Sequence, residues 1–82
     1  MARYSYVYAI ALKETSGLKA AIPVLEEARR HAPFDRDILI ALTQFNQELG
    51  RLAEARSAAH ELLKIAPNDT LALQLVQNLK GQ

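Results

Sequence analysis

The segment APFDRDIL (residues 32–39) returns 34 positions later as APNDTLAL (residues 66–73). Both copies share the pattern A-P-x-D-x-x-x-L, in which proline forbids a continuing helix and aspartate suits the start of a new one. The same offset pairs further residues upstream: Glu14 with Glu48, Leu18 with Leu52, Ala21 with Ala55, and Glu27 with Glu61. The sequence therefore predicts an internal repeat.

Each copy of the repeat reads as two short helices joined by a tight turn. In the second copy Asp35 can cap a helix start, because its carboxylate accepts backbone N–H groups one turn further on. Apolar residues then recur at spacings of three and four, which is typical of an amphipathic helix: Leu39, Leu42, Phe45 and Leu49. Gly50 suits the left-handed end of that helix, and a second apolar stripe runs on until Pro67. The short turn predicts an antiparallel pair.

The stretch RYSYVYAIAL, residues 3–12, is open to two interpretations when it is taken alone. Its large side chains stand at every second position, which is typical of a half-buried strand. Shifting the hairpin back by one repeat length instead places residues 3–15 on a first helix and Leu18–His31 on a second. The chain offers no other strand candidate as a sheet partner, and an isolated strand leaves its backbone groups unpaired. We therefore predict a helix.

The composition is that of one small globular domain. The 82 residues are 50% apolar and carry ten Lys and Arg against nine Asp and Glu, a net charge of +1. This balance lacks the basic excess of a nucleic-acid binder, so we expect no nucleic-acid partner. No span approaches the roughly 20 apolar residues of a membrane helix, so we expect no membrane association. The absence of cysteine suits a reducing compartment and favours the cytoplasm, while a periplasmic location stays open.

The repeat resembles the tetratricopeptide repeat (TPR), a helix–turn–helix unit of about 34 residues. The matching residues are Tyr8, Leu18, Ala21, Ala28 and Pro33 in the first copy, and Leu39, Leu42, Gly50, Leu52, Ala55 and Pro67 in the second. Residues 69–80 resemble the first helix of a third unit. The sequence departs from the family pattern where a small residue or an aromatic residue is usual, at Thr43, Leu62, Leu12 and Asn46.

The resemblance implies an all-α fold, in which antiparallel helix hairpins stack as a short right-handed α-solenoid of five helices. Within a single domain, residues 1–82, repeat one would span 2–35, repeat two 36–69, and a C-terminal helix 70–80. Each hairpin alone exposes an apolar face, which a neighbouring hairpin covers. The chain begins abruptly within an apolar pattern, so we expect it to be a fragment of a longer protein.

The residue types that catalysis or metal binding would need are sparse. There is no cysteine, no serine with a flanking motif and no glycine-rich phosphate loop. HELLK, residues 60–64, begins like a zinc-protease motif but has lysine where the second ligand is needed. Glu27 and His31 are too few ligands for a zinc site. We therefore expect no enzyme, no cofactor and no metal, and we interpret Arg29-Arg30-His31 as cations stabilised by the C-terminal end of a helix.

In TPR arrays the first helices of successive units line a concave groove, so the resemblance also implies a binding surface. The predicted groove residues are Arg3, Tyr6, Ile10 and Lys13 from repeat one, Asp37, Ile40, Gln44 and Gln47 from repeat two, and Gln74 and Asn78 from the last helix. Tyr6, Ile10 and Ile40 would be apolar anchors among polar side chains, as interfaces commonly have. The alternative is that these are ordinary exposed residues. Some family members hold a peptide carboxylate with a Lys/Asn/Arg clamp, but here the clamp positions carry Ile10, Gln44, Gln74 and Asn78, so we expect no clamp.

These observations favour a non-catalytic module that binds a protein or peptide in a concave groove. Two alternatives stay open: a structural or oligomerisation segment of a larger TPR protein, and a nucleic-acid-binding helical repeat. Tyr4 and Val7 would face a preceding unit. The last helix would be apolar on more than one side, through Leu71, Leu73, Leu75, Val76 and Leu79. Exposed apolar ridges usually mark an interface, so we also predict self-association through a terminal helix, or cover by a longer parent protein.

Overall fold

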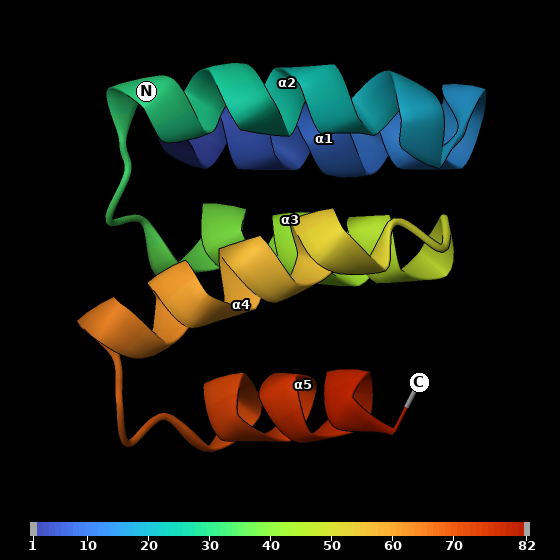
Figure 1. The fold of residues 1–82 in the computed structure, drawn as a ribbon. Helices are drawn as coiled ribbons and strands as arrows, with labels where there is room; N and C mark the ends of the chain where they lie inside the picture. The colour runs from blue at the N-terminus through green and yellow to red at the C-terminus, as the bar shows by residue number, and fades with distance from the viewer. Residues whose placement is uncertain (1, 82) are drawn as a thin grey trace.

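The computed structural model describes residues 2–81, with side chains from Tyr4 to Gly81. The described residues form five helices: α1 (Ala2–Ser16), α2 (Leu18–His31), α3 (Arg36–Glu48), α4 (Leu52–Ile65) and α5 (Thr70–Lys80). Figure 1 shows α1 with α2 and α3 with α4 as antiparallel hairpins, stacked in chain order with α5 last. No residue in this described range lies in a strand, so the predicted all-α helical repeat is confirmed.

The tyrosine-rich stretch lies inside α1, which confirms the helical interpretation. Four of its five alternating large residues separate into two pairs spaced by four, because a helix turns about 100° per residue. Tyr6 and Ile10 form the pair that packs against the core. Tyr4 and Tyr8 form the other pair, and their side chains are exposed.

The helix boundaries follow from local backbone chemistry, in the same way in both copies of the repeat. Asp35 caps α3 by accepting the N–H of Ile38 at 3.0 Å, and Asp69 caps α5 by accepting the N–H of Ala72 at 3.0 Å. Gly50 has φ +78, the left-handed conformation predicted for it after α3. The Gly50 N–H donates to the Gln47 carbonyl at 3.0 Å and the Arg51 N–H to the Asn46 carbonyl at 2.8 Å, so this turn satisfies two of the last four carbonyls of α3.

The apolar core follows the junctions between hairpins. One cluster joins α1 and α2 to α3 and includes Ala9, Ala21, Ile22, Leu25, Ala28, Ile38, Ala41, Leu42, Phe45 and Ala58. A second joins α3, α4 and α5 through Leu39, Ile40, Leu62, Ala72 and Leu75. A third joins α4 to α5 through Ala55, Ala59 and Leu79. Leu62, which is larger than the family pattern favours, is fully buried in the second cluster.

Two polar residues are buried among these apolar side chains, and both departures from the family pattern are satisfied locally. The Thr43 hydroxyl donates to the Leu39 carbonyl at 2.8 Å. The Asn46 amide donates to the Leu42 carbonyl at 2.8 Å. Because each side chain hydrogen-bonds one turn back along α3, its burial does not leave the donor group without a partner.

The last helix is less apolar on its outer side than its sequence predicts. Leu75 and Leu79 are buried, while Leu71 and Val76 are partly buried against the core. Among these five residues only Leu73 is exposed, at 50%. The predicted apolar ridge at this end is therefore wrong for most of its members, because α3 and α4 cover them. No helix within residues 2–81 has the length and apolar character needed to cross a membrane.

Candidate functional site

The first helices of the successive units lie in a row, in which α1 contacts α3 and α3 contacts α5. This row carries all ten predicted groove residues. The Arg3 side chain lies outside the described residues, so the groove is described from the remaining nine.

In α1 the groove residues are half-buried rather than fully exposed. Tyr6 and Ile10 are partly accessible and pack against the first core cluster. The Lys13 ammonium lies 4.0 Å from the Glu48 carboxylate and 5.3 Å from the centre of the Phe45 ring. These contacts tie α1 to α3, so the walls of the groove are connected by a charged pair and a cation–π contact.

Ile40 does not serve as an exposed anchor. Its side chain is only 8% exposed and packs in the second core cluster with Leu62 and Leu75. The physical reason is the presence of α5, which brings Ala72 and Leu75 against this part of α3. The prediction of Ile40 as an apolar anchor is therefore corrected: the residue joins two repeats.

The polar groove residues divide into exposed and half-buried side chains. Asp37, Gln44, Gln74 and Asn78 are exposed, and Gln47 is half-buried. The Asp37 carboxylate lies 3.8 Å from the Arg36 guanidinium.

A hollow of about 420 Å³ opens between α1 and the start of α3. It is lined by Tyr6, Val7, Asp35 and Asp37. The row thus offers an aromatic edge, two carboxylates and several amides to a ligand.

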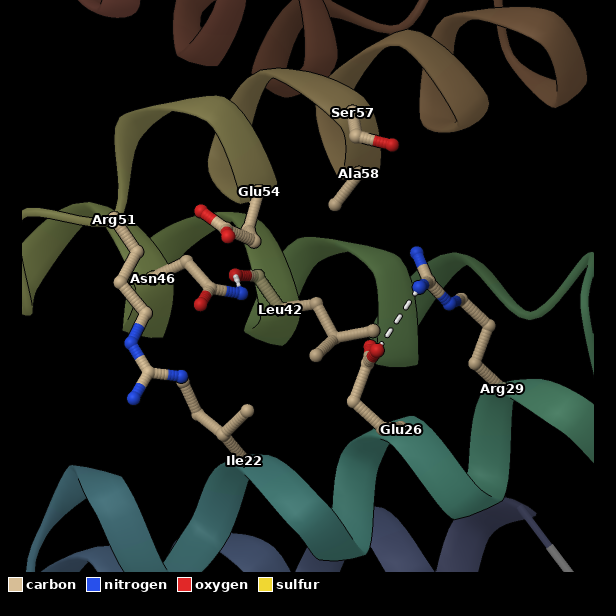
Figure 2. Close-up of a pocket in the computed structure, with 9 residues that line it drawn as sticks. All are labelled: Ile22, Glu26, Arg29, Leu42, Asn46, Arg51, Glu54, Ser57 and Ala58. Atoms are coloured by element: carbon tan, nitrogen blue, oxygen red, sulfur yellow. Dashed lines mark hydrogen bonds and ion pairs between the residues drawn. The ribbon is translucent and has the colours of Figure 1, made fainter.

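A second hollow, of about 190 Å³, lies on the other side of α3, between α2 and α4. Figure 2 shows Glu26 and Arg29 rising from α2 toward α4, with Glu54 and Arg51 facing them. Leu42 and Asn46 of α3 line its inner wall. The hollow contains two arginines and two glutamates, so its charges are balanced.

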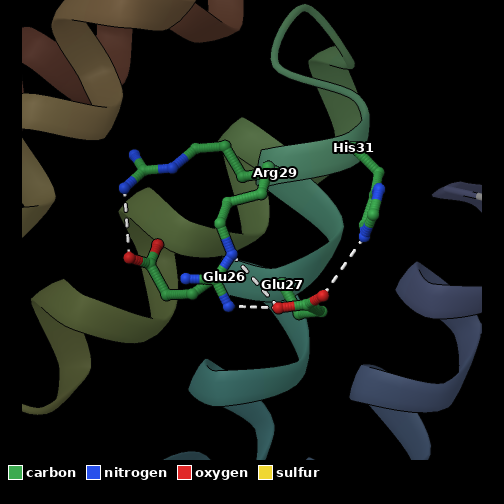
Figure 3. A network of polar contacts seen from close by, with 5 residues as sticks. Glu26, Glu27, Arg29 and His31 are labelled. Atoms are coloured by element: carbon green, nitrogen blue, oxygen red, sulfur yellow. Dashed lines mark hydrogen bonds and ion pairs between the residues drawn. The ribbon is translucent and has the colours of Figure 1, made fainter.

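The cluster Arg29-Arg30-His31 is paired along its own helix, as Figure 3 shows for its labelled members. The Arg29 guanidinium lies 3.1 Å from Glu26, and His31 Nε2 lies 3.1 Å from Glu27, to which Arg30 is also bound. Hydrogen bonds from Arg30 and then His31 hold the pKa of Glu27 below its usual value. These cations are neutralised locally, so the interpretation as helix-end charges is preferable to an anion site.

The second junction between hairpins carries a salt bridge that spans 33 residues of sequence. Arg36 Nε donates to Asp69 Oδ2 at 2.7 Å, and a second guanidinium nitrogen lies 3.2 Å from Oδ1. The pKa of Asp69 is lowered to about 2, first by this bond to Arg36 and then by the backbone N–H of Ala72. The Asp69 carboxylate therefore both caps α5 and links it to the start of α3 through Arg36.

The described residues include no group of three or more His, Asp or Glu placed to hold a metal ion. Sequence reasoning missed the hollow between α2 and α4 and the bridge from Arg36 to Asp69. The repeat offset could have revealed the bridge, since it places Arg36 one position after a cap equivalent to Asp69. The hollow had no signal in the sequence, because it forms between side chains of three helices.

The fold agrees with the comparison with protein families. The tetratricopeptide repeat model matches residues 18–79, more than half of the chain, from the start of α2 into α5. The chain therefore belongs to the tetratricopeptide repeat family. Its members are generally protein–protein interaction modules and typically non-catalytic scaffolds. A search of curated proteins and a search of solved structures each give no match.

Proposed function

We propose that the chain is a non-catalytic module that binds a peptide or helix of another protein along the row of α1, α3 and α5. The observation that carries this proposal is the half-buried aromatic edge of Tyr6 beside the hollow of about 420 Å³. An aromatic anchor with polar neighbours is the usual composition of a protein interface. The groove would use Tyr6 and Ile10 as its apolar contacts and the exposed Gln44, Gln74 and Asn78 for hydrogen bonds.

The test compares two double variants that carry the same amino-acid changes on different faces. Tyr6→Ala with Gln44→Ala alters the groove, while Tyr4→Ala with Gln77→Ala alters exposed side chains outside it. Affinity capture from the source lysate is expected to lose its specific partner with the groove variant and keep it with the control. Circular dichroism and thermal unfolding establish that both variants are folded. A partner that both variants retain would contradict the proposal.

A second candidate function is self-association through α1, and the exposure of its apolar side favours it. Tyr4, Val7 and Tyr8 are 72%, 58% and 57% exposed. Spacings of three and four place them on one face of α1. Tyr4 and Val7 are the residues that the sequence predicts to face a preceding unit, and this face would suit a structural segment of a larger assembly.

Light scattering over a range of concentrations tests self-association directly. The wild-type chain is expected to show a mass that rises with concentration, whereas Tyr4→Ala with Tyr8→Ala is expected to remain monomeric. The groove variant serves as the control here, because it leaves this face intact. A wild-type chain that is monomeric at high concentration would remove this candidate and leave the groove proposal standing.

A further inference from the structure

A third hollow lies at the C-terminal end, between α4 and α5, and it differs in charge from the other surfaces. Its volume is about 60 Å³, and its six lining residues are Arg56, Ala59, His60, Val76, Leu79 and Lys80. Ala59 and Leu79 are buried and Val76 is partly buried, so the floor is apolar. Arg56, His60 and Lys80 form an exposed basic rim. We refer to these six residues as the basic seat.

The basic seat, where α4 meets α5, corresponds by the repeat offset to the place where α2 meets α3. That earlier junction is covered by α4. The six residues 34 positions earlier, which are the counterparts of the seat, are Ile22, Leu25, Glu26, Leu42, Phe45 and Asn46. Four of these counterparts line the hollow between α2 and α4, and the other two lie in the first core cluster. At that junction α4 forms the outer wall, with Ala58 packed into the core cluster. The same arrangement of two helices therefore has a helical cover at one place and, within residues 2–81, none at the other.

The exposure of equivalent residues measures this missing cover. Leu42 is fully buried beneath α4, whereas its counterpart Val76 is only partly buried. Asn46 is 4% exposed, whereas its counterpart Lys80 is exposed. Among the apolar residues of the seat, Val76 thus keeps accessible surface, whereas Ala59 and Leu79 are only 1% and 2% exposed.

The charges of the two junctions also differ. In the covered junction Glu26 pairs with Arg29 at 3.1 Å. In the basic seat the counterpart of Glu26 is His60, and Arg56, His60 and Lys80 form no ion pair with another residue in the described range. The position of Lys80 in the last turn of α5 explains one of these cations through the helix dipole. Arg56 and His60 stand in the interior of α4, where the dipole offers no such explanation.

We infer that the basic seat docks an acidic amphipathic helix of a partner protein, lying across α4 and α5 as α4 lies across α2 and α3. A small apolar residue of that helix would pack on the accessible part of Val76, in the way that Ala58 packs at the earlier junction. Acidic residues on either side of it would pair with Arg56 and Lys80. Charge complementarity favours an acidic helix over a neutral one, and it selects the partner as well as attracting it. This surface is separate from the groove, because it lies on the other side of α5 from Gln74 and Asn78.

The test uses two peptides derived from residues 50–67, the segment whose helix covers the earlier junction. The acidic peptide carries Arg51→Glu and Ser57→Glu and keeps Glu54. The second peptide, called neutral because these three positions are uncharged in it, carries Gln at all three. Fluorescence anisotropy is expected to show the acidic peptide binding the wild-type chain at least about tenfold more tightly than the neutral one. Circular dichroism of both peptides verifies that their helix content is comparable.

A pair of charge-matched variants locates the site. Arg56→Gln with Lys80→Gln removes two of the three residues of the basic rim, and Lys19→Gln with Arg30→Gln removes the same charge from α2. The first is expected to abolish the tenfold preference for the acidic peptide, and the second is expected to keep it. Equal binding of the two peptides, equal behaviour of the two variants, or no binding of the acidic peptide would overturn the inference. Tighter binding of a single-stranded oligonucleotide than of the acidic peptide to the rim would also overturn it. So would a dimer of the chain alone that dissociates in the rim variant.

Discussion

The helices α1 and α3 occupy the same place in successive repeats, yet a face that is exposed on α1 is buried on α3. Tyr4 is 72% exposed and its counterpart Ile38 is fully buried, and Tyr8 is 57% exposed while its counterpart Leu42 is fully buried. In α3 this face packs against the preceding hairpin, formed by α1 and α2. The face of α1 has no hairpin before it within the described residues. In a stack of repeats, burial is therefore decided by the neighbour and not by the position within the unit.

The largest difference in stability is expected when both members of one equivalent pair, Leu42 and Tyr8, are truncated. Leu42→Ala is expected to lower the free energy of unfolding by about 2–5 kcal/mol, because it removes buried methyl groups and leaves a cavity. Tyr8→Ala is expected to change it by only about 0.5 kcal/mol, because most of that side chain is already in water. Urea denaturation measures both differences. Equal losses would show that the face of α1 is buried in solution.

A second equivalent pair, Ile40 and Tyr6, tests the same relation between burial and stability on the groove side. Ile40→Ala is expected to cost about 2 kcal/mol or more of unfolding free energy, because the side chain is buried between α3 and α5. Its counterpart Tyr6 is half-buried, so Tyr6→Ala is expected to cost less. Thermal and urea unfolding of the two variants provide the measurement. If Ile40→Ala left stability unchanged while abolishing partner binding, the residue would be the exposed anchor that its sequence position suggests.

The turns after α1 and α3 are expected to behave alike, in contrast to the helices that they end. Gly17 has φ +92 and Gly50 has φ +78, and an added methyl group would meet no atom within 4 Å at either glycine. Each change to alanine is therefore expected to cost about 1–2 kcal/mol through backbone strain alone. Gly81→Ala is the control, because Gly81 has φ −81 and an ordinary contact of 3.5 Å. A large difference between Gly17→Ala and Gly50→Ala would point to a neighbour at one turn.

The smallest expected effect concerns pH and the junction between α3 and α5. The pKa of Asp69 falls from 3.8 to about 2 on folding, so its contribution to stability is present above pH 3.8 and is lost as the pH falls through about 2. Asp69→Asn keeps a capping side chain but removes the charge that pairs with Arg36. The stability difference between wild type and this variant is expected to be constant near neutral pH and to shrink below about pH 4. Denaturation at a series of pH values checks this.

Two controls identify the source of that pH dependence. In a background of Arg36→Gln the stability lost through Asp69→Asn is expected to shrink at neutral pH, because the main cause of the lowered pKa is absent. Asp35→Asn removes the equivalent cap charge at the first junction, where the residue corresponding to Arg36 is Ala2. A pH profile that is unchanged in the Arg36→Gln background would assign the effect to the helix cap rather than to the salt bridge.

The helices and their boundaries could be predicted from the sequence because their signals are local. Asp35 and Asp69 cap the helix starts, Gly50 takes the left-handed conformation, and Pro67 follows the end of α4. Each acts through backbone geometry within a few residues, so the sequence alone determines where it applies. The internal repetition then settled the tyrosine-rich stretch, since a hairpin already recognised at one place requires a hairpin at the other.

The tertiary structure alone decided which residues of each unit are available to a partner. Ile40 and Tyr6 are equivalent by position, but the packing of α5 against α3 buries the first and leaves the second half-exposed. The basic seat depends in the same way on packing between helices: α4 covers the junction of α2 with α3, whereas no helix within residues 2–81 covers the junction of α4 with α5. The physical reason is that backbone preferences act over a single turn, whereas exposure and charge balance depend on side chains brought together from different helices.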